Sequence, residues 1–472
     1  MVASVENTIF QYLAGKRILI LGFGREGQSS LNFINKYYDF IHPKRITIAD
    51  RNPIEREDYP IIFGDNYLDA IAQADIVLKS PGISFRDFTI IRDGGRIYLE
   101  EFPGVEISSQ MDLFLRFVPS HVVGVTGTKG KSTTSTLVYK MFNAYSEKSF
   151  LLGNIGVPVL DRWEDYTEDT YLAVEMSSHQ LEFVSASPEV AVITNFFPEH
   201  LDHYQSYDQY LEAKLNICRY QTADDVLILN CNEEELVERT REVRSYKILV
   251  GKKGEKNYTG HQEDYALLDQ ENFHAFGETR QFPYGHQLLG VHQRMDVLYG
   301  VAATDHYNIS VKAQDFAIAN FRGIPHRLEK IGTYKGVRFY NDSIATIPEA
   351  TILALETLEA HWPVHTLIVG GMDRGISYEK LIHFLTEKSQ VKQIICLPDT
   401  GYSIADKLLD ANIVGDVSKV RDMEEAVALA YENTEIGSIC LLSPAAASYN
   451  KYKNFEHRGE DYRHWVEYYG NQ

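Results

Sequence analysis

The sequence has few cysteines, no long apolar run and a deficit of positive charge. Its four cysteines are scattered over 472 residues with no Cys-x-x-Cys pair, which argues against a disulfide framework or a cysteine metal site. No stretch approaches the roughly 18 apolar residues that span a bilayer, and the N-terminus lacks the apolar core of a signal peptide. The net charge of −20 argues against non-specific binding to nucleic acid or anionic membranes. We expect a cytoplasmic protein with neither partner.

Short apolar runs alternate with helical patterns along almost the whole chain, which is typical of parallel sheets covered by crossover helices. The fold class is therefore α/β. A length of 472 residues exceeds a single hydrophobic core and predicts about three domains. Strand-like patterns restart near residues 121 and 324, so we expect a Rossmann-like domain at 1–110, a central domain with a mostly parallel sheet at 111–323 and a second Rossmann-like domain at 324–472. The polar segment from about 252 to 286 is expected to form a peripheral sheet or excursion.

A glycine-rich loop between a strand and a helix is the strongest functional signal. The segment from Gly124 to Thr133 is GVTGTKGKST, and in such loops backbone N–H groups and the helix N-terminus cradle phosphate. Lys131 would bridge the terminal phosphates, and the hydroxyl of Ser132 or Thr133 would coordinate Mg²⁺. Val125 occupies the place of the first glycine of the strict pattern, so the loop is a variant. The alternative is a strand-to-helix turn that binds nothing.

A carboxylate follows the next predicted strand, TYLAVE, which ends at Glu175. Ligands gather at the carboxyl ends of strands in open α/β sheets, and Mg²⁺ prefers carboxylate, hydroxyl and water oxygens. Glu175 with Ser132 or Thr133 would therefore form a plausible Mg²⁺ site. A surface carboxylate in a salt bridge is the alternative.

A second glycine-rich turn lies near the start of the chain. Gly22-Phe-Gly24-Arg-Glu-Gly27 is followed about 23 residues later by Asp50, which is nearly a dinucleotide fingerprint and on its own predicts an NAD-dependent oxidoreductase. A polyphosphate at a helix N-terminus is common to many nucleotide ligands. The glycines alone therefore do not identify the nucleotide.

An ordered set of motifs resembles the Mur ligase family. These are GTKGKST, EMSSHQLE, TNFFPEHLDHY, YLEAKLNI, HRLE, NDS, GGMDRG, and LLSPAAAS with KNFEHRG. The resemblance covers nearly the whole chain, and the single Rossmann-like N-terminal unit with the KNFEHRG ending most resembles the members that add glutamate to UDP-N-acetylmuramoyl-L-alanine. It implies an N-terminal domain for the UDP moiety, a central P-loop domain for ATP and a C-terminal domain for the incoming amino acid.

The resemblance also implies the catalytic and metal-binding residues. The catalytic residues would be Lys131, Glu175, His200 and Lys214. The ligands of two Mg²⁺ ions would be Ser132, Glu175, His200 and a carbamylated Lys214. An ammonium would be repelled by metal ions, whereas a carbamate is an anionic oxygen donor suited to hard cations. Without the resemblance, a helix-face lysine and a lone histidine are more often structural.

Substrate-binding residues follow from the same resemblance. Those for ATP would be Gly127, Thr128, Gly130, Lys131, Ser132, Thr133, Arg327 and Asp342. Those for the UDP substrate would be Gly22, Gly24, Gly27, Asp50, Ser80, Gly82 and Asn154. Those for glutamate would be Thr346, Arg374, Ser448 and Phe455. Arg374 is suited to bind a carboxylate in bidentate fashion.

The reaction implied by the resemblance begins with transfer of the γ-phosphoryl group of ATP to the alanyl carboxylate. Lys131 and Mg²⁺ would neutralise the charge on the transferring group. The amine of glutamate would then attack the acyl phosphate, releasing phosphate and forming an amide. We expect a monomer that acts in peptidoglycan precursor synthesis, with hinge motion between domains.

Several positions depart from the pattern of the glutamate-adding members. Ile344 stands in place of a lysine in NDSIAT, and Gln293 and Asp296 replace asparagines usually found near adenine. Lys129 replaces an asparagine in the phosphate loop, and His179 replaces an aromatic residue in SSFQ. These departures leave open a variant ligase that takes L-glutamate or another amino acid.

Other functional classes remain as alternatives from the sequence. A folylpolyglutamate synthase-like ligase would share the phosphate loop, but about 120 residues precede that loop here, whereas folate enzymes of this type begin close to it. An NAD-dependent oxidoreductase built on GFGREG and a non-enzymatic nucleotide-binding protein are the remaining alternatives.

Overall fold

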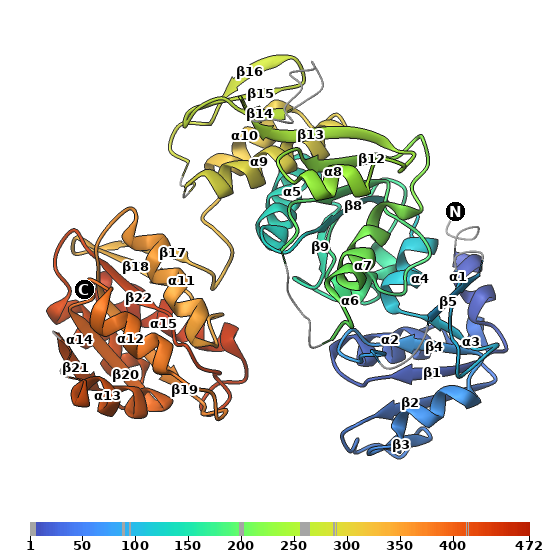
Figure 1. Ribbon diagram of the computed structural model, residues 1–472, viewed down its shortest axis with the longest axis horizontal. Coiled ribbons are helices and arrows are strands. Elements are labelled where there is room, and N and C mark those ends of the chain that lie inside the picture. Colours follow the sequence, from blue (N-terminus) through green and yellow to red (C-terminus); the bar gives the residue numbers. More distant parts are fainter. Residues whose placement is uncertain are drawn as a thin grey trace. The chain divides into compact units, whose positions relative to one another are not determined.

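Three β-sheets organise the protein (Figure 1). The computed structural model describes residues 6–86, 90–93, 96–197, 203–254, 265–286, 288, 290–411, 413 and 415–472. The chain divides into two units, Met1–Phe321 with two of the sheets and Arg322–Gln472 with the third. The predicted α/β class is confirmed by these mostly parallel sheets, while the predicted boundary between the first two domains stays a prediction.

The first sheet has seven strands in the order β3-β2-β1-β4-β7-β6-β5. Its strands are β1 (Arg17–Leu21), β2 (Arg45–Asp50), β3 (Ile61–Phe63), β4 (Ile76–Lys79), β5 (Ile90–Asp93), β6 (Arg96–Leu99) and β7 (Glu106–Ser108). Its helices are α1 (Glu6–Leu13), α2 (Arg25–Lys36), α3 (Tyr38–Ile41), the 3₁₀ helix η1 (Tyr67–Gln73) and α4 (Gln110–Phe117). The central strands β1 and β4 are apolar and buried because helices cover both faces of a parallel sheet.

The second sheet has nine strands in the order β16-β15-β14-β13-β12-β11-β8-β10-β9. They are β8 (His121–Thr126), β9 (Ser149–Gly153), β10 (Tyr171–Glu175), β11 (Val190–Ile193), β12 (Val226–Asn230), β13 (Tyr246–Lys252), β14 (Tyr265–Leu267), β15 (Asn272–Ala275) and β16 (Glu278–Gln281). Strands β14 to β16 pair in antiparallel fashion at one edge. The peripheral excursion expected near this segment is therefore present among its described residues, and residues 255–264 lie outside them.

Helices cover the second sheet on both faces. They are α5 (Lys131–Tyr145), η2 (Trp163–Asp165), α6 (Ser178–Leu181), α7 (Tyr207–Arg219), α8 (Glu234–Arg239), α9 (Gly290–Asp305) and α10 (Val311–Ala319). Helix α5 packs against α9 and α10 as well as against strands β8, β9 and β10. The helix that begins at the phosphate loop is therefore held by neighbours along its length.

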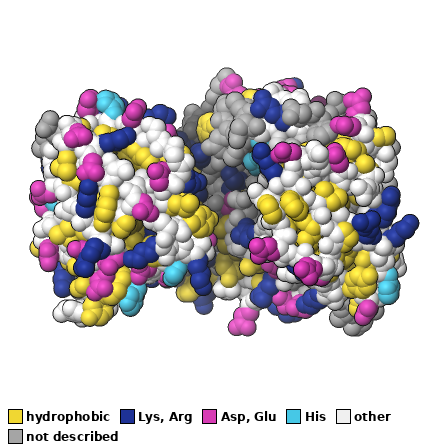
Figure 2. Space-filling model, turned by 90° about the horizontal axis from the view of Figure 1, so that it is seen from below, with side chains coloured by type: hydrophobic (Ala, Val, Ile, Leu, Met, Phe, Trp, Pro, Cys, Tyr) yellow, Lys and Arg dark blue, Asp and Glu magenta, His cyan; other side chains and the backbone are white. Residues whose placement is uncertain are grey.

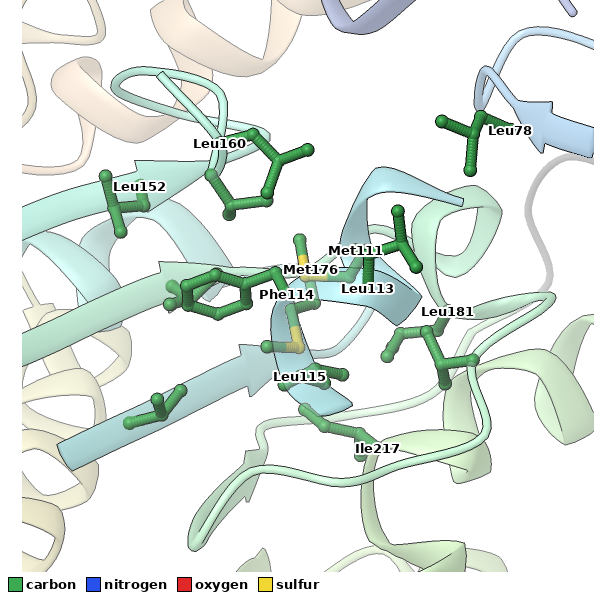
Figure 3. Close-up of a cluster of buried hydrophobic side chains, with 14 of the residues drawn as sticks. Leu78, Met111, Leu113, Phe114, Leu115, Leu152, Leu160, Met176, Leu181 and Ile217 are labelled. Carbon is green, nitrogen blue, oxygen red and sulfur yellow. The ribbon is translucent and has the colours of Figure 1, made fainter. Parts of the chain in front are cut away.

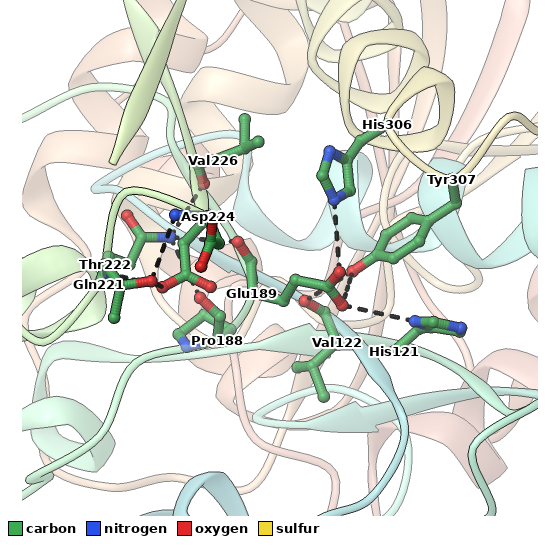
Figure 4. Close-up of polar contacts among 11 residues, drawn as sticks. His121, Val122, Pro188, Glu189, Gln221, Thr222, Asp224, Val226, His306 and Tyr307 are labelled. Carbon is green, nitrogen blue, oxygen red and sulfur yellow. Dashed lines mark hydrogen bonds and ion pairs between the residues drawn. The ribbon is translucent and has the colours of Figure 1, made fainter. Parts of the chain in front are cut away.

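A polar cluster connects the amino-terminal ends of strands β8 and β11 of this sheet (Figure 4). The carboxylate of Glu189, just before β11, accepts a hydrogen bond from the Tyr307 hydroxyl at 2.9 Å. The rings of His121 and His306 each place a nitrogen 3.4 Å from the same carboxylate. One acidic side chain thus joins the starts of β8 and β11 to the end of α9.

A continuous apolar cluster joins the first and second sheets (Figure 3). Phe114 on α4 is fully buried in it, together with Leu78 of β4 and Leu152 of β9. Leu181 of α6 and Ile217 of α7 complete the same cluster. Because burying a large apolar side chain contributes about 1.5–3 kcal/mol, α4 acts as a shared core element that fixes the two sheets against each other.

The second unit contains a six-stranded sheet in the order β17-β18-β22-β19-β20-β21. Its strands are β17 (Glu329–Tyr334), β18 (Val337–Asn341), β19 (Val364–Gly371), β20 (Gln393–Asp399), β21 (Asp416–Lys419) and β22 (Ile439–Leu442). Its helices are α11 (Pro348–Glu359), α12 (Glu379–Glu387), α13 (Thr400–Asp410), α14 (Met423–Asn433) and α15 (Phe455–Gly470). Only β17 pairs in antiparallel fashion with its neighbour among the described strands of this sheet.

Basic and acidic side chains are interspersed over the face shown in Figure 2. Within the described part of the chain, no helix has both the length and the apolar character needed to cross a bilayer.

Candidate functional site

The phosphate loop connects β8 to α5, as the sequence predicts. Gly127 and Gly130 have φ angles of +147° and +87°, which favour glycine. A Cβ atom on Gly127 would lie 1.9 Å from Oγ1 of Thr194, so a larger residue does not fit. The backbone N–H of Thr128 donates to the carbonyl of Asn195 at 2.9 Å. The loop is thereby fixed to the end of β11, with Ser132 and Thr133 in the first turn of α5.

Two predicted lysines converge on this loop. Nζ of Lys131 donates to the carbonyls of Gly127 and Thr128, both at 2.9 Å. Lys214 of α7 is only 2% exposed, and its Nζ donates to the same carbonyl of Gly127 at 2.7 Å. Residues 83 positions apart in the sequence therefore place their amines around one carbonyl oxygen.

Glu175 lies at the end of β10, where the sequence places it. It is 1% exposed, and its Oε1 accepts a hydrogen bond from Nδ2 of Asn154 at 2.7 Å. Its Oε2 is buried and has no hydrogen-bond partner among the described residues. Since an unpaired buried carboxylate oxygen is costly, this atom is suited to face a cation.

A cavity of about 280 Å³ lies beside the two lysines and Asn154, the residue that holds Glu175. Lys131 and Lys214 line it together with Asn154, and Gly82 lines it from the first sheet. The structure thus brings together residues that the sequence predicts for ATP, for metal and for the UDP substrate. His200, predicted as a metal ligand, lies outside the described residues.

A larger cavity of about 620 Å³ lies at the carboxyl ends of β1, β2 and β4. Five of the residues predicted for the UDP substrate line it, namely Gly22, Gly24, Asp50, Ser80 and Gly82. Asp50 shapes the rim, because its carboxylate accepts the backbone N–H groups of Phe23 at 2.7 Å and Asn52 at 2.8 Å. Gly82 lines both cavities.

Gly27 has a packing role and does not line either cavity. A Cβ atom at this position would lie 2.1 Å from the carbonyl oxygen of Gly22. The absence of a side chain therefore allows α2 to approach the loop that follows β1.

The sequence did not predict several polar groups around the cavities. Arg25 lines the larger cavity, and its Nη2 donates to the carbonyls of Gly153 at 3.3 Å and Asn154 at 3.2 Å. Glu26 accepts a hydrogen bond from Nε2 of Gln180 at 2.6 Å, and burial raises its pKa. Both residues are in the GFGREG motif, yet their contacts with residues more than 120 positions away leave no local signal.

A buried ion pair lies between the two sheets. Nζ of Lys79 is 3.0 Å from Oε2 of Glu182, and the lysine side chain is 1% exposed. A nitrogen of the His203 ring lies 3.4 Å from the same oxygen. Burial alone would raise the pKa of Glu182, but the charges and hydrogen bonds of Lys79 and His203 lower it. The only sequence signal is a lysine at the end of an apolar strand.

In the second unit, Asp342 follows β18 and is buried. Its carboxylate accepts hydrogen bonds from Oγ of Ser443 at 2.8 Å and from the backbone N–H of Leu328 at 3.1 Å. Burial raises the pKa of Asp342 to about 7. Arg327, which is also predicted to bind nucleotide, lies just before β17. Its side chain is exposed.

The predicted glutamate residues lie on loops of the same unit and at the start of α15. Nη2 of Arg374 donates to the carbonyl of Thr346 at 3.0 Å. Ser448 is buried in the loop after β22. Phe455 begins α15, and its carbonyl accepts a hydrogen bond from Oγ of Ser343 at 2.8 Å.

Arg458, which no sequence pattern singles out, connects these loops. It is 1% exposed, and its guanidinium donates to the carbonyl and the Oγ of Ser343, at 2.8 and 3.0 Å, and to the carbonyl of Ala446 at 2.9 Å. Among the described residues no carboxylate forms an ion pair with it. Burial lowers the pKa of Arg458 to about 10. Arg458 stands in KNFEHRG at the start of a helix that carries several other charged residues, so the sequence does not set it apart.

Comparison with known proteins identifies two matching family models and several similar relatives. The Mur ligase middle domain matches residues 125–304, and the domain described as Mur ligase, glutamate ligase domain matches residues 326–446. The chain is 31% identical over 464 residues to UDP-N-acetylmuramoylalanine–D-glutamate ligase of Symbiobacterium thermophilum, with 96% of this chain and 98% of that relative covered. It is 31% identical over 465 residues to the ligase of the same name from Clostridium botulinum, strain Kyoto, with 96% and 97% covered.

Solved structures share the fold. The MurF ligase of Thermotoga maritima in complex with ADP aligns with a TM-score of 0.52 at 16% identity, covering 98% of this chain and 97% of that chain. The UDP-N-acetylmuramate-alanine ligase MurC of the same organism aligns with a TM-score of 0.52 at 17% identity, covering 97% and 99%.

Proposed function

The chain belongs to the Mur ligase family of ATP-dependent amide-bond-forming ligases, and we propose that it joins D-glutamate to UDP-N-acetylmuramoyl-L-alanine. The structural observation that best supports this proposal is that Gly82 lines both cavities. A UDP-sugar in the larger cavity would extend its alanyl carboxylate past Gly82 toward Lys131 and Lys214. The reaction would serve peptidoglycan precursor synthesis in the cytoplasm.

We assign the three substrates to three parts of the chain. Residues 1–110 would hold the UDP moiety through the residues around the larger cavity, and 111–323 would hold ATP at the phosphate loop. Residues 324–472 would hold glutamate through Thr346, Arg374, Ser448 and Phe455, with Arg327 and Asp342 on the nucleotide. The match of the glutamate ligase domain to residues 326–446 supports this division.

The residues around Glu175 fit Mg²⁺. The unpartnered buried Oε2 of Glu175 is the kind of oxygen that a hard cation binds, and Ser132 carries a hydroxyl in the first turn of the neighbouring helix α5. His200 and a carbamylated Lys214 would complete the ligands for two ions. When bound, Mg²⁺ supplies positive charge that offsets the charge of the phosphates. Lys214 suits carbamylation because its side chain is buried and lines the smaller cavity together with Lys131.

The side chains of this chain have defined tasks in the proposed reaction. Lys131 would leave the carbonyls of Gly127 and Thr128 and bind the terminal phosphates of ATP. It would stabilise the γ-phosphoryl group during transfer to the alanyl carboxylate, which yields an acyl phosphate and ADP. The amine of glutamate would then attack the acyl carbon, and phosphate would leave as the amide forms. Asn154 would keep Glu175 oriented through its 2.7 Å hydrogen bond.

A phosphate-release assay with ATP, Mg²⁺, UDP-N-acetylmuramoyl-L-alanine and either enantiomer of glutamate tests the proposal. We expect release with D-glutamate and none with Lys131→Ala. Release with L-glutamate alone would favour a variant ligase, the alternative that the Ile344 departure leaves open. No release with either enantiomer would refute the proposed function. Lys214→Ala should lose most activity and regain part of it with added short carboxylates if a carbamate is present.

A further inference from the structure

Asp296 of α9 places a carboxyl group directly against the phosphate loop. The side chain is buried, with 7% of the residue exposed. Its Oδ1 lies only 2.7 Å from the position that a Cβ atom would take on Gly130, the residue before Lys131. The same oxygen accepts a hydrogen bond from Oγ1 of Thr134, in the first turn of α5, at 3.1 Å. The carboxyl group is therefore held between α9 and the amino-terminal end of α5.

This position is unfavourable for a negative charge once phosphate is bound. The loop N–H groups and the N-terminus of α5 attract anions, so an ionised Asp296 and a polyphosphate would compete for the same positive potential. Two negative charges in a partly desolvated site repel each other by several kcal/mol at short distance, on the order of 4 kcal/mol at 4 Å for an effective dielectric constant of about 20. A neutral carboxyl group removes that repulsion.

The surroundings already favour the neutral form. Burial raises the pKa of Asp296 to about 8, against the opposing effect of the Thr134 hydrogen bond. The charged residues of the phosphate loop are Lys129 and Lys131, and the basic residues among the first five positions of α9 are His292 and Arg294. Lys131 donates to loop carbonyls, and Nε of Arg294 donates to the carbonyl of Gln270 at 2.9 Å. Within the described residues, none of these cations forms an ion pair with Asp296.

We propose that nucleotide binding at the phosphate loop is coupled to uptake of one proton by Asp296. This inference rests on the proposed role of the loop as the ATP site. The proton comes from solvent and adds to the carboxylate as the nucleotide binds, and it returns to solvent when the nucleotide leaves. Asparagine has nearly the same shape as the neutral acid and carries no charge at any pH, so Asp296→Asn separates the charge of this side chain from its volume.

The coupling sets a pH dependence of known sign. With a pKa of about 8 in the free protein, about nine-tenths of Asp296 is protonated at pH 7 and about one-tenth at pH 9. The free energy of binding is fully available below the pKa of the free form and falls as the pH rises above it. The affinity for nucleotide should therefore fall about tenfold between pH 7 and pH 9, and proton uptake should rise from near zero at pH 6.5 toward one at pH 9.

Isothermal titration of the full-length chain with ADP and Mg²⁺ tests the proposal. Titrations in two buffers of different ionisation enthalpy at each pH give the number of protons bound. We expect the wild-type protein to show uptake that grows with pH, and Asp296→Asn to show none and to keep its affinity at pH 9. Melting temperatures verify that both proteins are folded.

Asp305→Asn is the matched control. Asp305 is a second buried carboxyl group on α9 with a raised pKa caused mainly by burial. Its carboxyl group accepts hydrogen bonds from Nε2 of Gln314 at 2.6 Å and from the hydroxyl of Tyr265 at 2.8 Å. Asp305 is the last residue of α9. This variant should behave as the wild type. Titration of the nucleotide itself is the same for all three proteins and cancels in the comparison.

Four results would overturn the inference. Binding of ADP by the wild type without proton uptake would do so while leaving the ATP site intact. Retention of the pH-dependent loss of affinity by Asp296→Asn would assign the proton to another group. Loss of binding at every pH in Asp296→Asn would mean that an ionised Asp296 acts on the metal or the nucleotide. Failure of the wild type to bind ADP at any pH would refute the proposed ATP site, and the inference with it.

Discussion

Replacement of Arg458 by methionine should destabilise the second unit more than any replacement of an exposed arginine there. The guanidinium is buried and donates to three oxygens, two of Ser343 and one of Ala446. Methionine fills part of the same volume but donates no hydrogen bond. The variant would leave these acceptors buried and without their donor.

The magnitude follows from these contacts. A hydrogen bond to a charged group contributes about 1.5–3 kcal/mol, so three would contribute about 5–9 kcal/mol. Burial of a charge without a carboxylate partner offsets part of this, because removing the guanidinium also relieves its desolvation. We expect a net loss of about 3–5 kcal/mol. For a unit of the size of Arg322–Gln472, 1 kcal/mol corresponds to about 2–4 °C, so its melting transition should fall by about 10–15 °C.

Thermal unfolding of the full-length protein, followed by calorimetry, measures this change. Arg421→Met is the control, because Arg421 is an exposed arginine whose side chain is 84% accessible and pairs with Glu425 at 3.1 Å. Exposed pairs of this kind contribute little, and we expect no resolvable shift. If Arg458→Met and Arg421→Met have the same melting temperature, the buried hydrogen bonds of Arg458 do not stabilise the unit. Arg458→Met should also raise KM for glutamate, since Ser343 bonds the carbonyl of Phe455.

Three further predictions concern other parts of the chain. Gly27→Ala should lower stability and UDP-substrate affinity because its Cβ would overlap a carbonyl, whereas Gly24→Ala, whose Cβ meets nothing within 4 Å, should keep the wild-type melting temperature. Lys79→Met should cost about 3–5 kcal/mol by leaving Glu182 buried without its cation, and adding Glu182→Gln should restore part of the loss in denaturant titrations. The raised pKa of Asp342, about 7, means that the folded state binds more protons than the unfolded state between about pH 4 and 7. Stability should therefore fall as the pH rises through this window, and Asp342→Asn should flatten the pH dependence of the melting temperature.

The features that the sequence predicts well are local ones. The phosphate loop depends on a strand, two glycines and a helix within about a dozen residues, so its position and the site of Lys131 follow from the pattern. Glu175 follows for a similar reason, because a strand end in a parallel sheet has a known place in the fold. The α/β class follows from the alternation of apolar runs. The GFGREG glycines predict a nucleotide site but not the identity of the nucleotide, because their local geometry suits NAD and a UDP-sugar equally.

Contacts between distant residues were beyond prediction from a single sequence. Asp296 reaches Thr134 across 162 positions, and Arg458 reaches Ser343 across 115. Neither contact leaves a periodicity or spacing that the sequence reveals. The resemblance to the Mur ligases drew attention to Asp296 as a departure, but only the structure shows that its carboxyl group touches the phosphate loop. The ligands assigned to each domain stay predictions until the substrates are tested.

The apolar cluster around α4 has a consequence for the order in which the chain folds during synthesis. Leu78 and Phe114 belong to one buried cluster with Ile217, and roughly 100 residues must be added after Phe114 before Ile217 is made. At about 5–20 residues per second this takes about 5–20 s. During that time the growing chain presents the apolar face of α4 without its partner from α7. A chaperone that binds exposed apolar segments would therefore act on this protein while it is still attached to the ribosome.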